Sequence, residues 1–446
     1  MPLKCSFKSK DETISCKRDI HKDGVCLFHL PLTERSPGED TIFRKKIDEL
    51  IEKEDTNWAG FIFPNNFFIY DLTINKKLDL RWSITNDITI NNVSFNDEVD
   101  MRHTTASGNF HISKTIFRKK FKAAGSTFHK STQINAEHSG STYYNQCNFH
   151  GPVLFTGSIN GTTSFHEATF HDTTIFRGGR SVHVTQNLAP AKDKKTDNSI
   201  TLNWLFNSET LITEVDFRHP ERVKFISTNL SQVKFVGTNV KGVNFEYTNF
   251  YQSYLKRQGL FDEVDTLLMK DPSLQKYLWP RIEVEYRNFR VAMEENKNYA
   301  TASDFYIGEM ETRRHQMTYP RKYFFSIAAI YNALSEYGTN PSRAARIFLL
   351  LILLHLSLTM YFGPPPREAY NKAFSATSTT PLITNTFGTL LLYFTNSLKI
   401  LSLQRGPEVL ETKSLNSNII DSVFRIIGPA QLALIALSFR SKIKRH

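Results

Sequence analysis

The chain has 446 residues, of which 40% are hydrophobic and 22% charged, and its mean hydropathy is −0.35. A single core rarely grows beyond about 250–300 residues, so the length predicts several modules. The mean hydropathy excludes a protein built mostly of lipid-facing helices, and the net charge of +11 excludes an acidic surface resembling DNA. Thirty-five phenylalanines against four tryptophans favour a repeated internal position that one aromatic side chain fits.

The N-terminal segment contains three of the four cysteines and a histidine in the spacing C-x10-C-x9-C-x2-H. These residues are Cys5, Cys16, Cys26 and His29. Three thiolates and one imidazole suit tetrahedral zinc, and a segment of about 30 residues buries too little apolar surface to fold alone. We therefore predict a zinc-binding module over residues 1–36, with a structural zinc as cofactor. Incidental free cysteines are the alternative, and His21 is the alternative fourth ligand.

The same four ligands leave no open position for water, so catalysis by this zinc is not expected. Four cysteines are too few for a secreted disulfide framework, and reduced thiols indicate the cytosol. Residues 1–30 carry charge throughout and lack a continuous apolar core, so a secretory signal is not expected there. Residues 37–57 are expected to form a connector helix capped by Asp40. Its apolar face contains Phe43, Ile47, Leu50 and Ile51.

A strict five-residue repeat is the main architectural signal. Large apolar residues recur at Phe225, Leu230, Phe235, Val240, Phe245 and Phe250. Valine or threonine stands two positions before each of them. A period of five matches neither a helix nor a strand, so short bent segments must return the same side of the chain inward. This predicts a β-solenoid whose central residues stack from coil to coil.

A looser version of the repeat runs upstream from about Trp58, where small-x-Phe triplets recur at irregular spacings that indicate insertions between coils. Cys147 occupies the small position of one triplet, which indicates packing rather than reactivity. Residues 187–200 fit no register and are expected to leave the solenoid as a loop. Four histidines follow a central phenylalanine and should point outward to a solvated rim, with a metal-binding or pH-sensing ladder as the alternative. They are His129, His150, His166 and His171.

These repeats resemble the pentapeptide-repeat family, and the resemblance covers residues 58–252. It implies a right-handed quadrilateral β-helix. Some proteins of that family occupy topoisomerases by mimicking DNA, which requires a strongly negative surface. Because this chain is basic, a topoisomerase-binding DNA mimic is only the second alternative function, and a nucleic-acid partner is not favoured.

A helical period replaces the five-residue repeat in the segment 253–340. One stripe contains Tyr286, Phe289 and Met293, and a second follows the polar stretch 294–298. Two antiparallel helices are therefore predicted, similar to half a tetratricopeptide repeat. A bundle that caps the open end of the solenoid is favoured over a partner-binding module.

A transmembrane module is predicted over residues 341–446. Residues 347–362 contain no charge, and a helix of this length measures about 24 Å, which local thinning of a bilayer accommodates. His355 at mid-span is expected to hydrogen-bond a neighbouring helix rather than line an ion pathway. A second span covers residues 419–439, where Gly428 and Pro429 interrupt the apolar run and are hinge candidates.

Between the two spans, residues 387–403 are amphipathic and carry a polar stripe. We predict that this stripe lines a pore through Thr389, Tyr393, Asn396 and Lys399. Basic residues flank both spans on the same side, so the positive-inside rule predicts that the solenoid and both termini lie in the cytoplasm.

The order of span, amphipathic helix and span looks like the pore module of two-transmembrane ion channels, although no potassium filter follows the middle helix. As a whole, the chain is similar to bacterial membrane-attached pentapeptide-repeat proteins with a channel-like C-terminus. The predicted function is an oligomeric protein of the cytoplasmic (inner) membrane, in which the solenoid senses or binds a cytoplasmic protein partner and is coupled to a pore. A membrane-anchored binding scaffold without conductance is the alternative. No enzyme is expected, because the sequence lacks a G-x-S-x-G, P-loop or H-E-x-x-H element.

Overall fold

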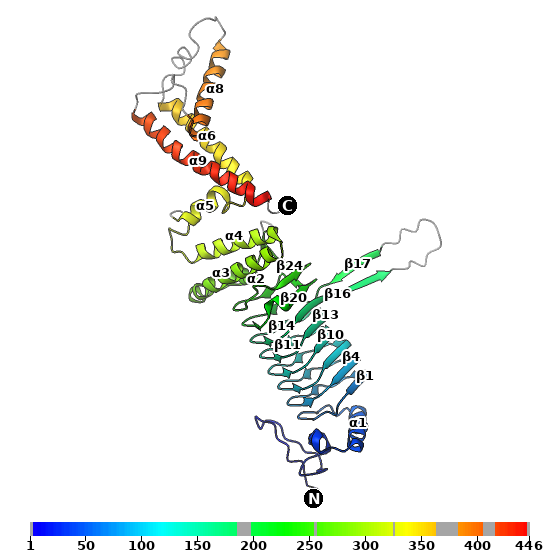
Figure 1. The fold of residues 1–446 in the computed structure, drawn as a ribbon. Coiled ribbons are helices and arrows are strands. Elements are labelled where there is room, and N and C mark those ends of the chain that lie inside the picture. Colours follow the sequence, from blue (N-terminus) through cyan, green and yellow to red (C-terminus); the bar gives the residue numbers. More distant parts are fainter. Residues whose placement is uncertain are drawn as a thin grey trace, which may run out of the picture. The chain divides into compact units, whose positions relative to one another are not determined.

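The computed structural model describes residues 3–184, 198–253, 257–323, 326–362, 382–404 and 415–443. The chain divides into two compact units, residues 1–312 and residues 313–446. The first unit consists of β-strands with helices before and after them, and the second unit consists of helices (Figure 1).

The first unit is a β-solenoid of about eight turns, in which successive strands of each sheet come from successive coils (Figure 1). The longest sheet contains β1 (Phe67–Ile74), β4 (Ile88–Phe95), β7 (Phe110–Phe117), β10 (Thr132–His138), β13 (Val153–Ile159), β16 (Thr174–Val184), β20 (Val223–Ile226) and β23 (Asn244–Glu246). The second contains β2 (Leu78–Asp79), β5 (Val99–Asp100), β8 (Phe121–Lys122), β11 (Thr142–Tyr143), β14 (Thr163–Ser164), β18 (Thr210–Leu211) and β22 (Val233–Lys234). The third contains β3 (Ile84–Thr85), β6 (Thr105–Ala106), β9 (Thr127–Phe128), β12 (Asn148–Phe149), β15 (Thr169–Phe170) and β19 (Asp216–Phe217). A short sheet joins β21 (Asn229–Leu230), β24 (Asn249–Gln252) and β25 (Gln258–Gly259).

The length of a coil explains why the five-residue repeat is strict only near its end. Lys224 of β20 pairs with Asn244 of β23, and four segments of five residues fill this step without remainder. Upstream, Phe67 pairs with Ile88, and Ile88 pairs with Phe110. These upstream steps are longer than four segments of five, so they contain insertions that shift the register.

Stacked aromatic side chains fill the solenoid, as the repeat predicted. All six central residues between Phe225 and Phe250 are buried. The ring of Phe225 is stacked on Phe176 and Phe245, at centroid distances of 4.8 and 5.3 Å. These distances are close to the separation of about 4.7–4.9 Å between hydrogen-bonded strands, so each coil adds one ring to the stack. Cys147 is fully buried and donates to the carbonyl of Ala123, consistent with the predicted packing role.

An antiparallel hairpin leaves the solenoid at β16 and returns through β17 (Asn198–Asn203) (Figure 1). Of the loop predicted over residues 187–200, positions 187–197 lie outside the described residues. Its last three residues belong to β17, so a loop was the wrong prediction for them. Ser199 pairs with His183 and Thr201 with Ser181, which shows that the alternating Ser-Ile-Thr-Leu sequence forms a strand.

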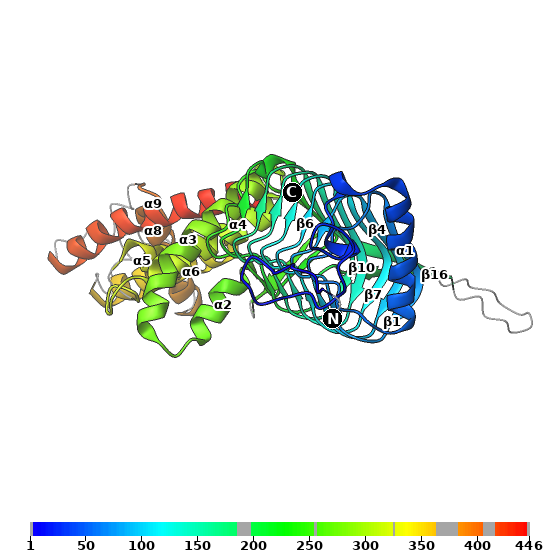
Figure 2. The same cartoon turned by 90° about the horizontal axis from the view of Figure 1, so that it is seen from below.

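The N-terminal segment covers the first coils of the solenoid. It contains two short 3-10 turns, η1 (Leu27–His29) and η2 (Leu32–Glu34), followed by α1 (Pro37–Glu52). Ser36 and Glu39 form a capping box, so this helix begins earlier than the predicted cap at Asp40. The buried ring of Phe43 on α1 lies 6.1 Å from that of Phe67 on β1, and Figure 2 shows the helix beside this edge of the solenoid.

Three helices follow the last coils: α2 (Phe261–Leu268), α3 (Pro272–Glu295) and α4 (Tyr299–His315). The two predicted helices correspond to α3 and α4, and α3 begins earlier than expected because Asp271 caps it through the N–H of Ser273. The buried Phe289 of α3 contacts Phe235 and Phe245, at centroid distances of 5.0 and 5.3 Å. The helices therefore cover the end of the aromatic stack, as the capping interpretation held.

The second unit contains α5 (Ile327–Ser335), α6 (Pro341–Phe362), α8 (Leu382–Leu401) and α9 (Leu415–Ile443). Of the described helices, two contain stretches long and apolar enough to cross a membrane, Pro341–Phe362 and Asn418–Arg440. The last helix continues through Pro429, so the predicted interruption does not end it. A small apolar core joins α6, α8 and α9 through Ile352, Ile400, Leu401 and Phe424.

Candidate functional site

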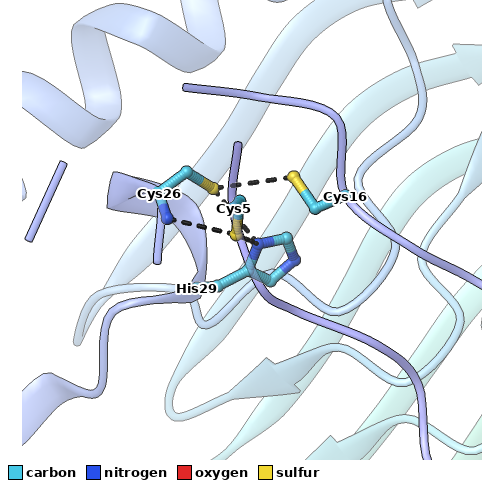
Figure 3. A group of neighbouring side chains, drawn as sticks. All are labelled: Cys5, Cys16, Cys26 and His29. Carbon is cyan, nitrogen blue, oxygen red and sulfur yellow. Dashed lines mark hydrogen bonds between the residues drawn. The ribbon is translucent and has the colours of Figure 1, made fainter. Parts of the chain in front are cut away.

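The predicted metal ligands lie together at the N-terminal end of the chain (Figure 3). Cys5 and Cys16 belong to segments joined by the antiparallel bridges of Lys4 with Asp19 and Lys8 with Ser15. Cys26 stands just before the turn η1 and His29 is its last residue, and Gly24 adopts a φ of +81° just before them, a conformation that favours glycine. All four ligand atoms lie within 4.8 Å of one another.

Their separations fit one tetrahedral ion. With Zn–S bonds of about 2.3 Å and Zn–N bonds of about 2.1 Å, two sulfurs lie about 3.8 Å apart and a sulfur lies about 3.6 Å from a nitrogen. The Sγ atoms of Cys16 and Cys26 are 3.8 Å apart, and Cys5 Sγ lies 3.5 Å from His29 Nδ1. Cys26 Sγ lies 3.1 Å from the same nitrogen, about 0.5 Å closer than in an ideal site. The four side chains can therefore bind one metal ion.

The histidine is already oriented for this role. Its Nε2 lies 3.1 Å from the carbonyl oxygen of Ala59, which accepts only from a protonated nitrogen, so Nδ1 keeps its lone pair toward the thiols. Phe7 stacks on the imidazole at a centroid distance of 3.9 Å and an angle of 4°. The ring of His29 is thus fixed on one face by packing and at its far nitrogen by the first solenoid coil.

Backbone N–H groups point at the sulfurs and stabilise thiolates. The N–H of Cys26 donates to Cys5 Sγ at 3.2 Å, and the N–H of Arg18 donates to Cys16 Sγ at 3.4 Å. In the metal-free chain, the hydrogen bond from Cys26 lowers the pKa of Cys16 to about 3 against the effect of burial. The same contact and burial raise the pKa of Cys26. Contact with the neighbouring thiol therefore favours the thiolate form at Cys16.

The alternative ligand and the histidine ladder lie elsewhere. His21 Nε2 lies 2.7 Å from Glu39 Oε1, on the cap of α1, and does not join the cysteines. The rings of His129, His150 and His171 form a stack with centroid distances of 5.1 and 4.5 Å. Within the described part of the chain, the N-terminal set is the one group whose three or more ligand atoms approach closely enough for an ion.

The proposed pore stripe lies on α8. Tyr393 and Asn396 are 0% and 4% exposed, and Lys399 is half-buried. The side chain of Thr389 lies outside the described residues. Because Tyr393 and Asn396 are already buried in a single copy of the chain, their polar groups do not require a neighbouring copy to leave the lipid. Their role as pore lining stays a prediction.

The hinge candidates lie where two helices approach closely. A Cβ atom on Gly428 would collide with the backbone and side chain of Leu401 on α8, so the glycine permits this contact. Pro429 follows it within α9. Bending at this pair stays a prediction.

The structure adds a polar cluster that the sequence reasoning found only in part. The expected hydrogen bond of His355 to a neighbouring helix is confirmed, because its ring contacts Ser397 of α8 and Asp421 of α9. Ser397 and Asp421 were not predicted as its partners. A signal was present at Asp421, since a carboxylate inside an otherwise apolar segment needs a partner.

No protein-family model, curated protein or solved structure matches this chain.

Proposed function

We propose that the chain is a membrane-anchored binding protein of the bacterial inner membrane. A zinc-stabilised solenoid lies at the cytoplasmic face of the bilayer and binds a protein partner through its outer surface. The observation that carries this proposal is the distribution of features between the two units. The candidate metal centre and the described solenoid strands belong to residues 1–312, and both helices able to cross a membrane belong to residues 313–446.

The proposed role of the metal is structural. Cys5, Cys16, Cys26 and His29 supply four protein ligands, which complete a tetrahedral zinc and leave no position for substrate. His29 joins this centre to Ala59, and Phe28 stacks on Phe61 at 4.3 Å. Zinc would thus fix the segment that covers the first aromatic layer of the solenoid.

The solenoid is proposed to be a right-handed, four-sided pentapeptide-repeat helix. The step from Lys224 on β20 to its partner Asn244 on β23 supports this proposal, because it divides into four segments of five residues. Polar side chains form ladders on its outside, such as Asn86 with Asn65 and Asn92 with Asp71. Rigid, repeated polar surfaces of this kind suit a protein partner.

Membrane attachment can be tested in the full-length chain. Leu350 and Leu354 of α6 are 58% and 51% exposed, so replacing both with arginine should prevent insertion without opening the packed side of the helix. The protein should then move from the carbonate-washed membrane fraction to the soluble or aggregated fraction. The same change at Leu267 and Leu268 of α2, which are also exposed, should leave it in the membrane. Equal fractionation of both double variants would contradict the proposal.

An oligomeric pore is the second candidate function. It is favoured by the order of elements, because α8 with its polar stripe stands between the two helices able to cross a membrane. The burial of Tyr393 and Asn396 within one copy favours the anchor instead. Ion flux through liposomes containing the purified full-length protein distinguishes the two, since an anchor conducts nothing.

A further inference from the structure

Three polar side chains from three helices meet inside the second unit. His355 of α6 is completely buried, and its Nδ1 lies 2.9 Å from Ser397 Oγ of α8. Its Nε2 lies 3.0 Å from Asp421 Oδ1 of α9. Phe424 closes one side of the ring at a centroid distance of 4.8 Å, and Thr359 Oγ1 lies 3.4 Å from Nδ1. The imidazole is therefore enclosed, with two hydroxyl groups near Nδ1 and a carboxylate at Nε2.

The hydroxyl groups near Nδ1 each have a second acceptor within their own helix. The hydrogen of Ser397 reaches either the carbonyl oxygen of Tyr393 or Nδ1, each 2.9 Å away, and Thr359 donates to the carbonyl of His355. When the Ser397 hydrogen points to Tyr393, Nδ1 carries a hydrogen and donates it to Ser397 Oγ. When it points to the ring, Nδ1 is the acceptor.

The other nitrogen needs a second hydrogen. Nε2 and the Asp421 oxygen are 3.0 Å apart, which is a hydrogen-bond distance, so one hydrogen lies between them. With a hydrogen also on Nδ1, the pair holds two ionisable hydrogens, one on Nδ1 and one shared with the carboxylate. A neutral imidazole facing an ionised carboxylate would hold only one.

We propose that His355 and Asp421 form a proton-binding site that joins α6 to α9. The hydroxyl group of Ser397 on α8 changes its hydrogen-bond acceptor when the proton binds or leaves. When the proton leaves to solvent, Nε2 keeps a hydrogen for Asp421 and Nδ1 becomes an acceptor. The hydroxyl hydrogen of Ser397 then turns from the Tyr393 carbonyl to Nδ1. The ligand is thus a single proton, and its release breaks the Ser397–Tyr393 hydrogen bond within α8 and reverses the direction of the one between Nδ1 and Ser397.

Charge links this proton to helix packing. The filled pair is neutral overall, whereas the empty pair leaves one negative charge on Asp421, whose side chain is 25% exposed, beside the fully buried ring, where it is less favourable than in water. Asp421 supplies the charge that faces His355 from α9, and α8 faces it with the uncharged hydroxyl of Ser397. Arg425 lies one turn beyond Asp421 but is exposed, and Lys399 lies two positions after Ser397 and is half-buried. Filling the site therefore favours the packed arrangement of the three helices, without requiring a pore or a partner.

The protonation state can be read directly in the full-length protein in lipid nanodiscs. With ¹⁵N-labelled histidine at pH 6, the His355 signals, identified by their loss in His355→Gln, should show a protonated Nδ1. Asp421→Asn should convert the same ring to a form with an unprotonated nitrogen, whereas Glu336→Gln, which removes a carboxylate at the end of α5, should leave it unchanged. A wild-type ring with a bare Nδ1 at pH 6 overturns the proposal, even if no variant folds.

A second measurement tests the link to packing. Amide hydrogen exchange over α9, corrected for the intrinsic effect of pH, should become less protected between pH 6 and pH 8 in the wild type. The protection factors of the α9 amides should fall by up to about tenfold per pH unit, as expected when one proton is lost with unpacking. In folded His355→Gln the protection should no longer depend on pH in this range. Unchanged wild-type protection, or an equal pH dependence in the variant, overturns the coupling.

Discussion

The carboxylate of Asp262 on α2 accepts hydrogen bonds from the backbone N–H of Phe235, which lies 3.1 Å from each carboxylate oxygen. The same side chain accepts from Val236 at 3.3 Å, and Glu285 of α3 accepts from Gly237 at 3.1 Å. These N–H groups belong to the last coil of the second sheet, which no further coil pairs among the described strands. Two buried acids therefore accept hydrogen bonds from the backbone N–H groups of this sheet edge, which would otherwise be able to pair with a strand of another chain.

The acidic cap predicts that the solenoid is more stable in mild acid. Burial raises the pKa of Asp262 to about 7, and burial together with the charge of Asp262 raises the pKa of Glu285. The folded chain therefore binds more protons than the unfolded chain between about pH 4 and pH 7, so stability falls as the pH rises through this window. One such group changes the free energy of unfolding by about 1.4 kcal/mol per pH unit, or about 2 kcal/mol from pH 5.5 to pH 7.

Chemical unfolding of the full chain at a series of pH values measures this dependence. Asp262→Asn should reduce its slope, because one of the two groups no longer titrates. Glu221→Gln, a change at an exposed carboxylate in η3 (Pro220–Arg222), should preserve the slope. A wild-type stability that rises from pH 5.5 to pH 7 would be the opposite of what the buried acids require.

The metal centre predicts one zinc per chain and a local effect of its loss. Cys26→Ser removes the sulfur nearest to His29 Nδ1, so bound zinc should fall at least about tenfold when measured by elemental analysis. Without the ion, residues 1–36 should become sensitive to protease while the solenoid stays folded, because only the first aromatic layer loses its cover.

Cys147→Ser provides the matched control. That thiol lies inside the solenoid and donates to Ala123, so its replacement should leave the zinc content unchanged. Fully folded, protease-resistant wild-type protein without any bound metal would refute the structural role of zinc.

The aromatic stack predicts a large cost for a single cavity. Phe225 is completely buried between Phe176 and Phe245, so Phe225→Ala should lower the free energy of unfolding by about 3–5 kcal/mol in urea titrations. Lys241→Ala changes an exposed side chain on a later coil and should stay within about 0.5 kcal/mol. Similar costs at both positions would mean that the stacked rings do not hold the coils together.

Local patterns in the sequence were sufficient for the solenoid core and for the cluster of candidate metal ligands. The period of five identifies Phe225 and its equivalents as buried without any long-range information, and the cysteine spacing identifies the four ligands. The helix α2 escaped prediction because its short sequence, FDEVDTLL, is too brief to establish a period. The start of α1 was misplaced because Asp40 was preferred to the capping box of Ser36 with Glu39.

Contacts between distant residues were beyond the reach of these patterns. Asp262 and Glu285 lie 27 and 48 residues after the N–H groups of Phe235 and Gly237 that they cap. No local spacing links such positions. His355 is likewise separated from Asp421 by 66 residues, so only the packing of α6 against α9 shows that the two titratable groups form a pair.

The remaining prediction separates the anchor from the pore at Lys399. This residue lies at the end of α8 that follows the buried Tyr393 and Asn396, and it is half-buried. If several copies enclose a water-filled path, a charge reversal at its wall should change ion selectivity, because a charged ring sets the local ion concentration. Lys399→Glu should then alter the reversal potential or the conductance in liposomes while the oligomer keeps its size in mild detergent. Lys276→Glu, at an exposed site on α3 in the first unit, is the control and should leave both unchanged. In the anchor, neither variant produces a current, and membranes containing folded wild-type protein stay impermeable. Wild-type conductance that is insensitive to Lys399→Glu would place any ion path away from the predicted stripe.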